Sequence, residues 1–203
     1  MAPFFVAEDA PSHGADDMPS LPFMKTLTLF RHGKSGWDSP VSRDFDRPIN
    51  ERGVKGSRLM GAHAASLGLT FDHVISSPAV RCTETLDGFW EGFGQIVHPS
   101  WDRRIYLASG ASLLDVVHDL PDSVSQVLMC GHNPGTEELA MMLVPETKGD
   151  DLRDELEEKF PTASIAEIQM DVARWADVKD GKATLTRFIR PRDLDPELGP
   201  GAD

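Results

Sequence analysis

The chain has 203 residues, of which 40% are hydrophobic and 26% are charged, an ordinary balance for a soluble globular domain with a buried core. Its formal net charge of -13 argues against nucleic acid and anionic membrane as main partners. No apolar run approaches the roughly 20 residues of a membrane-spanning helix, and two cysteines without a CxxC pair predict a cytoplasmic protein with neither a disulfide framework nor a zinc site.

The first part of the chain combines a polar extension with one strong strand signal. Residues 1–24 are rich in Pro, Ser, Gly and Asp and lack a basic leader, so we expect a disordered extension rather than a secretory signal. The run KTLTLF at 25–30 predicts a central strand that delivers Arg31 and His32 at its carboxyl end. After a loop, Asn50 is expected to cap the first helix.

The rest of the chain alternates between short apolar runs and amphipathic stretches. The expected strands are residues 73–77, 96–97, 125–132, 163–170 and 182–190. Three further helices are expected: one begins at Pro78, one near Ser109 or Ser112, and one at residue 135. An Asp-Gly pair at 180–181 predicts a turn between the last two strands. The Pro-, Gly- and Asp-rich tail at 191–203 is expected to be disordered. Strands that alternate with helices predict a three-layer α/β/α sandwich with a mainly parallel central sheet, formed by one domain over residues 25–190.

Three of the expected strands end in groups of chemically active residues. These groups are RHG at 31–33, SSPAVR at 76–81 and GHN at 131–133. Ligands of parallel sheets bind beyond the carboxyl ends of the strands. We therefore expect a single site that contains Arg31, His32, Arg81 and His132.

These residue types suit phosphoryl transfer. A neutral imidazole is a competent nucleophile toward phosphorus, and the resulting N–P bond is labile enough to be hydrolysed in a second step. The transferred group spreads negative charge over its equatorial oxygens, and the planar guanidinium of arginine binds two such oxygens at once. The set supplies a nucleophile in His32 and clamps in Arg31 and Arg81. His132 adds a second imidazole, so we expect neither a metal nor another cofactor.

Four segments in chain order carry a family resemblance: TLFRHGKSGWD, RPINERG, ISSPAVRCTETL and MCGHNPG. They resemble the motifs of the histidine phosphatase superfamily, whose fold is phosphoglycerate-mutase-like. Within that superfamily the chain is most similar to the SixA-type phosphohistidine phosphatases, and the segment FPTASIAEI at 160–168 shares this similarity. The resemblance covers about residues 25–190 and implies a phosphatase that works through a phosphohistidine intermediate.

The resemblance also implies a role for each matching residue. His32 would be the phosphorylated nucleophile. Arg31 and Arg81 would grip the phosphate, and His132 would hydrogen-bond the phosphoryl oxygens. Arg47 of the RPINERG segment is expected to line the mouth of the pocket and to contact the substrate.

Two positions depart from the family's pattern. Asp38 stands where many relatives have an Asn in the phosphate pocket, so its carboxylate must pair with an arginine, turn outward or be protonated. Mutase-like members carry a glutamate proton donor after the third strand, whereas SWDRRIYLASGAS has Asp102 as its only carboxylate. An alkoxide leaving group needs a well-placed acid, whereas an imidazole leaves once its own ring is protonated. This pattern favours a protein phosphohistidine as the substrate.

Three other functions remain open. The same residues would serve a phosphatase of small phosphorylated metabolites. A phosphomutase would need a proton-donor carboxylate and room for an intermediate to reorient, and the stretch between Arg81 and His132 offers little material for either. A non-catalytic phosphate-binding module belongs to a different class, but a pure binder has no need of an unprotonated imidazole.

Overall fold

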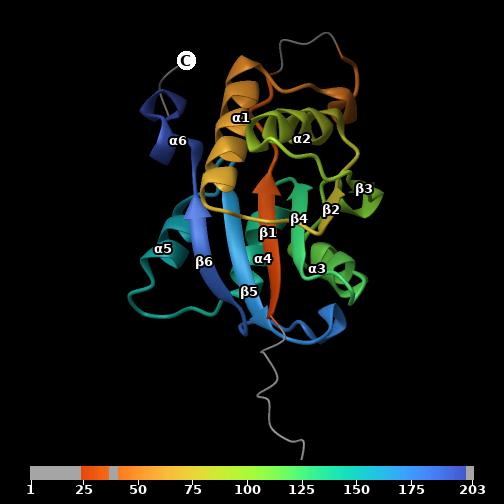
Figure 1. Cartoon of the computed structure of the whole chain (residues 1–203), viewed down its shortest axis with the longest axis vertical. Helices are drawn as coiled ribbons and strands as arrows, with labels where there is room; N and C mark the ends of the chain where they lie inside the picture. The colour runs from red at the N-terminus through yellow and green to blue at the C-terminus, as the bar shows by residue number, and fades with distance from the viewer. Residues whose placement is uncertain (1–23, 37–40, 200–203) are drawn as a thin grey trace, which may run out of the picture.

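The computed structural model describes residues 24–36 and 41–199, in which helices cover both faces of a six-stranded sheet (Figure 1). In chain order the strands are β1 (Met24–Arg31), β2 (His73–Ser76), β3 (Ser100–Trp101), β4 (Gln126–Gly131), β5 (Ile165–Asp171) and β6 (Thr184–Ile189). The helices are α1 (Glu51–Ser66), α2 (Val80–Phe93), α3 (Gly110–His118), α4 (Gly135–Leu143), α5 (Asp151–Glu158) and α6 (Pro191–Leu194). Short 3-10 turns are η1 (Asp44–Asp46), η2 (Arg103–Ile105), η3 (Trp175–Asp177) and η4 (Pro196–Leu198).

The sheet has the order β3-β2-β4-β1-β5-β6 and is mainly parallel, as the sequence predicts. β1 pairs in parallel with β4, and β2 pairs in parallel with β3 and β4. β5 runs antiparallel to both of its neighbours, β1 and β6. In this register Arg31 lies opposite Gly131, and Ser76 lies opposite Cys130. The carboxyl ends of β1, β2 and β4 therefore meet at one edge of the sheet, as expected for the three motif-bearing strands.

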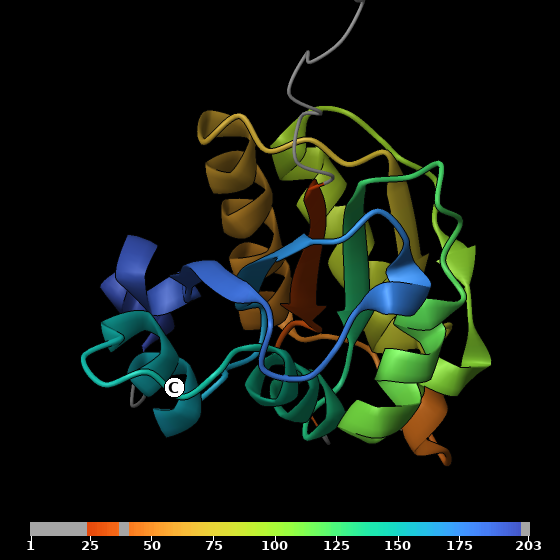
Figure 2. The same ribbon diagram turned by 90° about the horizontal axis from the view of Figure 1, so that it is seen from below.

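Two helical layers enclose the sheet, which confirms the predicted sandwich. Figure 2 shows α1 and α2 on one side of the sheet and α3, α4 and α5 on the other. Successive residues of a strand point to opposite faces. Phe30 of β1 thus packs in the core beneath α1 and α2 with Met60 and Phe89, whereas Leu27 and Leu29 belong to the core on the opposite side. Burial on both faces explains why β1 reads as a continuous apolar run.

Close packing between α1 and α2 depends on glycine. A methyl group at Gly61 would lie 1.9 Å from the carbonyl oxygen of Phe89, and one at Gly92 would lie 2.0 Å from the carbonyl oxygen of Arg58. Both distances are far inside van der Waals contact, so only glycine allows the two backbones to approach this closely. This contact anchors the helix whose first turn carries Arg81.

One local prediction is wrong and another is confirmed. Residues 96–97 form no strand, and the edge strand is instead Ser100–Trp101, because pairing with β2 rather than local hydrophobicity decides its position. The turn predicted at 180–181 is confirmed. Residues 172–183 connect β5 to β6, and this connection places Trp175 in the core.

The tail that composition predicts to be disordered is folded as far as Gly199. It forms α6 and η4, which lie beside α1 (Figure 1). Arg52 of α1 donates through Nη2 to the carbonyl oxygens of Leu198 and Gly199 at 2.7 and 2.6 Å, and Leu198 is buried. These tertiary contacts stabilise a segment whose local sequence favours disorder. Within residues 24–36 and 41–199, no helix combines the length and the hydropathy that a membrane span requires.

Candidate active site

His32 lies just beyond β1, where its backbone is hydrogen-bonded to β4 and to the segment before β5. Its backbone N–H donates to the carbonyl oxygen of Gly131 at 3.0 Å, and its own carbonyl accepts from the N–H of Ala163 at 3.1 Å. The side chain is buried, and its Nδ1 lies 2.7 Å from the carbonyl oxygen of Gly33. Because a carbonyl only accepts, Nδ1 carries the proton and Nε2 keeps its lone pair. The ring therefore offers Nε2 as the nucleophilic atom.

The surroundings of His32 keep its ring neutral. Burial lowers the pKa of His32 to about 3, and the positive charges of Arg81, Arg31 and Arg47 act in the same direction. The hydrogen bond to Gly33 favours the protonated ring but does not offset these effects. At neutral pH the imidazole is unprotonated, which is the form that attacks phosphorus.

Arg81 is a fully buried side chain in the first turn of α2. Its Nε donates to Nδ1 of His132 at 3.2 Å, its Nη1 to the carbonyl oxygen of Asp44 at 2.7 Å, and its Nη2 to Oδ2 of Asp44 at 3.0 Å. Three of the five guanidinium N–H groups are thus used to fix its orientation. Tyr106 also interacts with this guanidinium, and the N–H groups that these contacts do not use can face an oxyanion.

His132 follows β4 and lies beside His32, with the two ring centroids 5.1 Å apart. Its Nδ1 accepts from Arg81, so its Nε2 carries the proton and donates to the hydroxyl of Ser77 at 2.9 Å. Burial, His32 and Arg81 lower the pKa of His132 to about 2. The ring therefore positions Arg81. The sequence led us to expect that His132 donates directly to a phosphoryl oxygen. For this, the ring must gain a second proton and Arg81 must move away from Nδ1. A phosphate dianion nearby favours the protonated ring.

Arg31 reaches the same edge of the sheet from the end of β1. Its Nη1 donates to the carbonyl oxygen of Phe160 at 2.5 Å. Its Nε is buried and has no hydrogen-bond partner among the residues that the structure describes. Burial lowers the pKa of the guanidinium, and the charge of Glu137 acts against that shift. The side chain therefore retains donors for a bound anion.

Asp44, in the loop between β1 and α1, and Tyr106, just after η2, are two site residues that the sequence did not predict. Oδ2 of Asp44 accepts from the hydroxyl of Tyr106 at 2.8 Å as well as from Arg81. Its Oδ1 lies 3.2 Å from Nη2 of Arg47, which brings that residue to the site. Partial burial opposes ionisation of Asp44, but the Tyr106 hydrogen bond and the two arginine charges hold its pKa below the ordinary value. The charged segment SRDFDRP was the sequence signal for this loop.

Of the two remaining carboxylates predicted from the sequence, only Asp102 lies in the described part of the chain. Asp38 lies outside the described residues. Asp102 accepts from the backbone N–H of Arg104 at 2.8 Å and from its Nη2 at 2.7 Å, and these hydrogen bonds lower its pKa. An ionised carboxylate is a poor general acid. In the part of the chain that the structure describes, no group of three or more His, Cys, Asp or Glu side chains is placed to hold a metal ion.

Known proteins are similar to this chain in sequence and in fold. A sequence model described as "Histidine phosphatase superfamily (branch 1)" matches residues 27–104. An uncharacterized protein of Mycobacterium tuberculosis is 31% identical over 163 residues, which cover 80% of this chain and 99% of the relative. The chain belongs to the histidine phosphatase superfamily.

Solved structures of this superfamily agree with the expected subgroup. A protein of Agrobacterium tumefaciens named as a SixA phosphohistidine phosphatase is 28% identical, with a TM-score of 0.66 and coverage of 85% of this chain and 100% of its own. A protein of Nakamurella multipartitia named in the same way is 26% identical, with a TM-score of 0.71 and coverage of 83% and 96%. A phosphoglycerate mutase of Bacillus anthracis, 18% identical with a TM-score of 0.51 over 80% of this chain and 91% of its own, shares the fold. The resemblance predicted from the four motifs is confirmed.

Proposed function

We propose that this histidine phosphatase hydrolyses its substrate in two steps through a phosphohistidine at His32, without a metal ion. One observation carries the proposal: the buried ring of His32 binds Gly33 through Nδ1 and keeps Nε2 unprotonated beside several arginines. The guanidinium groups of Arg31, Arg81 and Arg47 supply the positive charge that a transferring phosphoryl group requires.

In the first step Nε2 of His32 attacks phosphorus in line. The new N–P bond forms as the bond between phosphorus and the leaving group breaks, and the leaving group departs with the bonding electron pair and takes up a proton. In the second step a water oxygen attacks phosphorus, the N–P bond breaks, and its electron pair returns to Nε2. The water loses a proton, and inorganic phosphate is released. The free N–H groups of Arg31 and Arg81 stabilise the equatorial oxygens in both steps.

Neither Asp102 nor Asp44 offers a protonated carboxyl group, which supports a labile substrate. Asp102 is bound to Arg104 and Asp44 is bound to Arg81, and both have lowered pKa values. An imidazole leaving group is protonated on its own ring and needs no strong acid from the enzyme. We therefore propose a protein phosphohistidine as the substrate, with small phosphorylated metabolites second. The names of the Agrobacterium and Nakamurella proteins agree with this proposal.

We also propose that the protein works in the cytoplasm. Its two cysteines, Cys82 and Cys130, are free and buried. Free thiols are the usual state in a reducing compartment.

The direct test compares wild type with His32→Ala in the presence of EDTA. The substrates are p-nitrophenyl phosphate and a phosphohistidine peptide, and the exposed His98→Ala variant is the matched control. The proposal expects turnover by wild type and His98→Ala and loss of turnover in His32→Ala. Undiminished turnover in His32→Ala would refute the nucleophile. Phosphate-protected melting with no turnover of any phosphorylated substrate would instead indicate a binding module.

A further inference from the structure

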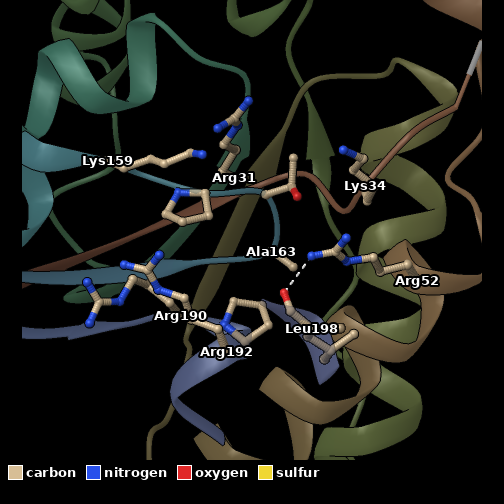
Figure 3. Close-up of a pocket in the computed structure, with 12 residues that line it drawn as sticks. Arg31, Lys34, Arg52, Lys159, Ala163, Arg190, Arg192 and Leu198 are labelled. Carbon is tan, nitrogen blue, oxygen red and sulfur yellow. Dashed lines mark hydrogen bonds between the residues drawn. The ribbon is translucent and has the colours of Figure 1, made fainter. Parts of the chain in front are cut away.

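A second feature of the sheet edge is a pocket of about 380 Å³ that shares Arg31 with the active site (Figure 3). It lies between the end of β1, the start of α1, the segment before β5 and the folded tail. Its charged lining residues are Arg31, Lys34, Arg52, Lys159, Arg190 and Arg192. Among the described residues, no Asp or Glu side chain lines it. We call this feature the basic pocket.

The basic pocket is lined by positive charges, although the chain as a whole is acidic. The sequence holds 33 acidic residues against 20 lysines and arginines, yet six of those 20 line this one cavity. Like charges repel one another, so such a concentration lowers stability unless an anion compensates it. In an acidic protein this concentration of cations is not a consequence of bulk charge, and it favours the binding of an anion.

Some cations of the basic pocket are already bonded to other groups of the protein, whereas others form no ion pair and can contact a ligand. Arg190 pairs with Glu155 at 2.8 Å and with Asp193 at 2.9 Å, and Arg52 binds the carbonyl oxygens of the tail. By contrast Lys34, Lys159 and Arg192 form no ion pair within the described part of the chain. Figure 3 shows Lys34 and Lys159 on opposite sides of Arg31.

We propose that the basic pocket binds a second phosphate group of the substrate, next to the phosphoryl group that His32 attacks. Lys34, Lys159 and Arg192, together with Arg31, carry more positive charge than a single carboxylate would neutralise. Their charge suits a phosphate dianion. Arg31, whose Nε is buried without a described partner, links the two sites. This inference rests on the proposed function and narrows its substrate class to molecules with two phosphates.

Two classes of substrate could supply a second phosphate group. One is a phosphoprotein with a second phosphorylated residue near the phosphohistidine, and the other is a bisphosphorylated metabolite. The experiment measures kcat/KM for two matched substrate pairs at low salt. The first pair is a phosphohistidine peptide with serine or phosphoserine at a neighbouring position. The second pair is the monophosphate and the bisphosphate of propane-1,3-diol.

The variant that tests the basic pocket is Lys34→Met with Lys159→Met, two exposed side chains whose replacement keeps the aliphatic stem. The matched control is Lys179→Met with Lys182→Met, which removes two charges from the exposed connection between β5 and β6 at the opposite edge of the sheet. The wild type is expected to prefer the doubly phosphorylated member of at least one pair by about tenfold in kcat/KM. The pocket variant should lose most of that preference through KM, and the control variant should keep it.

The preferred pair identifies the source of the second phosphate. Equal kcat/KM for both members of both pairs, or a preference that survives in the pocket variant, would overturn the proposal while leaving the phosphatase function intact. If no substrate is hydrolysed, binding of inorganic pyrophosphate by calorimetry separates the two hypotheses. Binding that the pocket variant loses would support the basic pocket, and binding that it keeps, or no binding to wild type, would overturn it.

Discussion

Arg81 and His132 form a hydrogen-bonded pair in which the guanidinium Nε donates to the imidazole Nδ1 across 3.2 Å. Both side chains are buried, and they come from α2 and from the end of β4, two elements that are far apart in the sequence. The hydrogen bonds to His132 and Asp44 fix the orientation of the Arg81 guanidinium. The orientation of the guanidinium therefore matters as much as its charge.

The first prediction concerns that orientation. Arg81→Lys keeps the positive charge but removes the planar fork that holds His132, Asp44 and an oxyanion at once. We expect kcat to fall by about 100-fold, the usual scale for the loss of a transition-state donor. Steady-state kinetics measures it, with Arg58→Lys as the control, because Arg58 forms an exposed ion pair with Glu91 at 3.1 Å. Equal kcat in the two variants would contradict the role given to the fork.

The second prediction concerns Asp44, whose carboxylate holds Arg81 and accepts from Tyr106. Asp44→Asn removes the charge and should lower kcat/KM by about tenfold, because Arg81 loses its ionic partner. Tyr106→Phe should have a smaller effect. The control is Asp46→Asn, since Asp46 pairs at 2.6 Å with the exposed Arg43. A rise in activity on Asp44→Asn would show instead that Asp44 competes with phosphate for Arg81.

The third prediction concerns the dependence of stability on pH. The pKa of His32 is about 3 and that of His132 is about 2 in the folded protein, against an ordinary value of 6.5. Below pH 6.5 the unfolded chain therefore takes up protons that the native rings do not, so falling pH destabilises the fold until the folded pKa is reached. Well below pH 6.5 each ring contributes a slope of about 1.4 kcal/mol per pH unit.

Urea unfolding of wild type and His32→Asn between pH 7.5 and 5 measures this effect. The difference between the two free energies of unfolding isolates the titration of His32 from that of the carboxylates. The wild type should lose stability more steeply than the variant as the pH falls below 6.5. Parallel curves would mean that the ring of His32 titrates alike in the folded and unfolded states.

The fourth prediction tests the packing of α1 on α2. Gly61→Ala would force a methyl group to 1.9 Å from the carbonyl oxygen of Phe89, and we expect a loss of about 3 kcal/mol in the free energy of unfolding. Gly56→Ala is the matched control in the same helix, because a methyl group there meets its first neighbour, Ala163, at 3.5 Å. That control should gain about 0.5–1 kcal/mol from helix propensity. Similar stability of both variants would contradict the close approach.

Local patterns predict most of the fold because the sheet is buried and parallel. The continuous apolar run of β1 and the alternation of strands with helices indicate a central strand in a three-layer sandwich. Local patterns do not predict the strand Ser100–Trp101 or the folded tail, because tertiary contacts determine both. The first is a strand only because it pairs with β2, and the second is ordered by the bonds from Arg52 to the carbonyl oxygens of Leu198 and Gly199.

The candidate site divides in the same way. His32, Arg81 and His132 were predictable because each follows a parallel strand, and such strands end at one edge. Asp44 and Tyr106 were not, because they meet only in the tertiary structure and their local segments carry no motif. The fixed tautomer of His132 also depends on two distant partners, Arg81 and Ser77.

Detection of a phosphoenzyme shows whether His32 is the nucleophile. The protein is mixed with phosphoramidate, quenched in base within its first turnovers and digested, and mass spectrometry locates the phosphoryl group. We expect an acid-labile, base-stable phosphohistidine at residue 32 that is absent from His32→Ala. Hydrolysis in which the phosphoryl group never appears on His32, or appears on another residue, would contradict it.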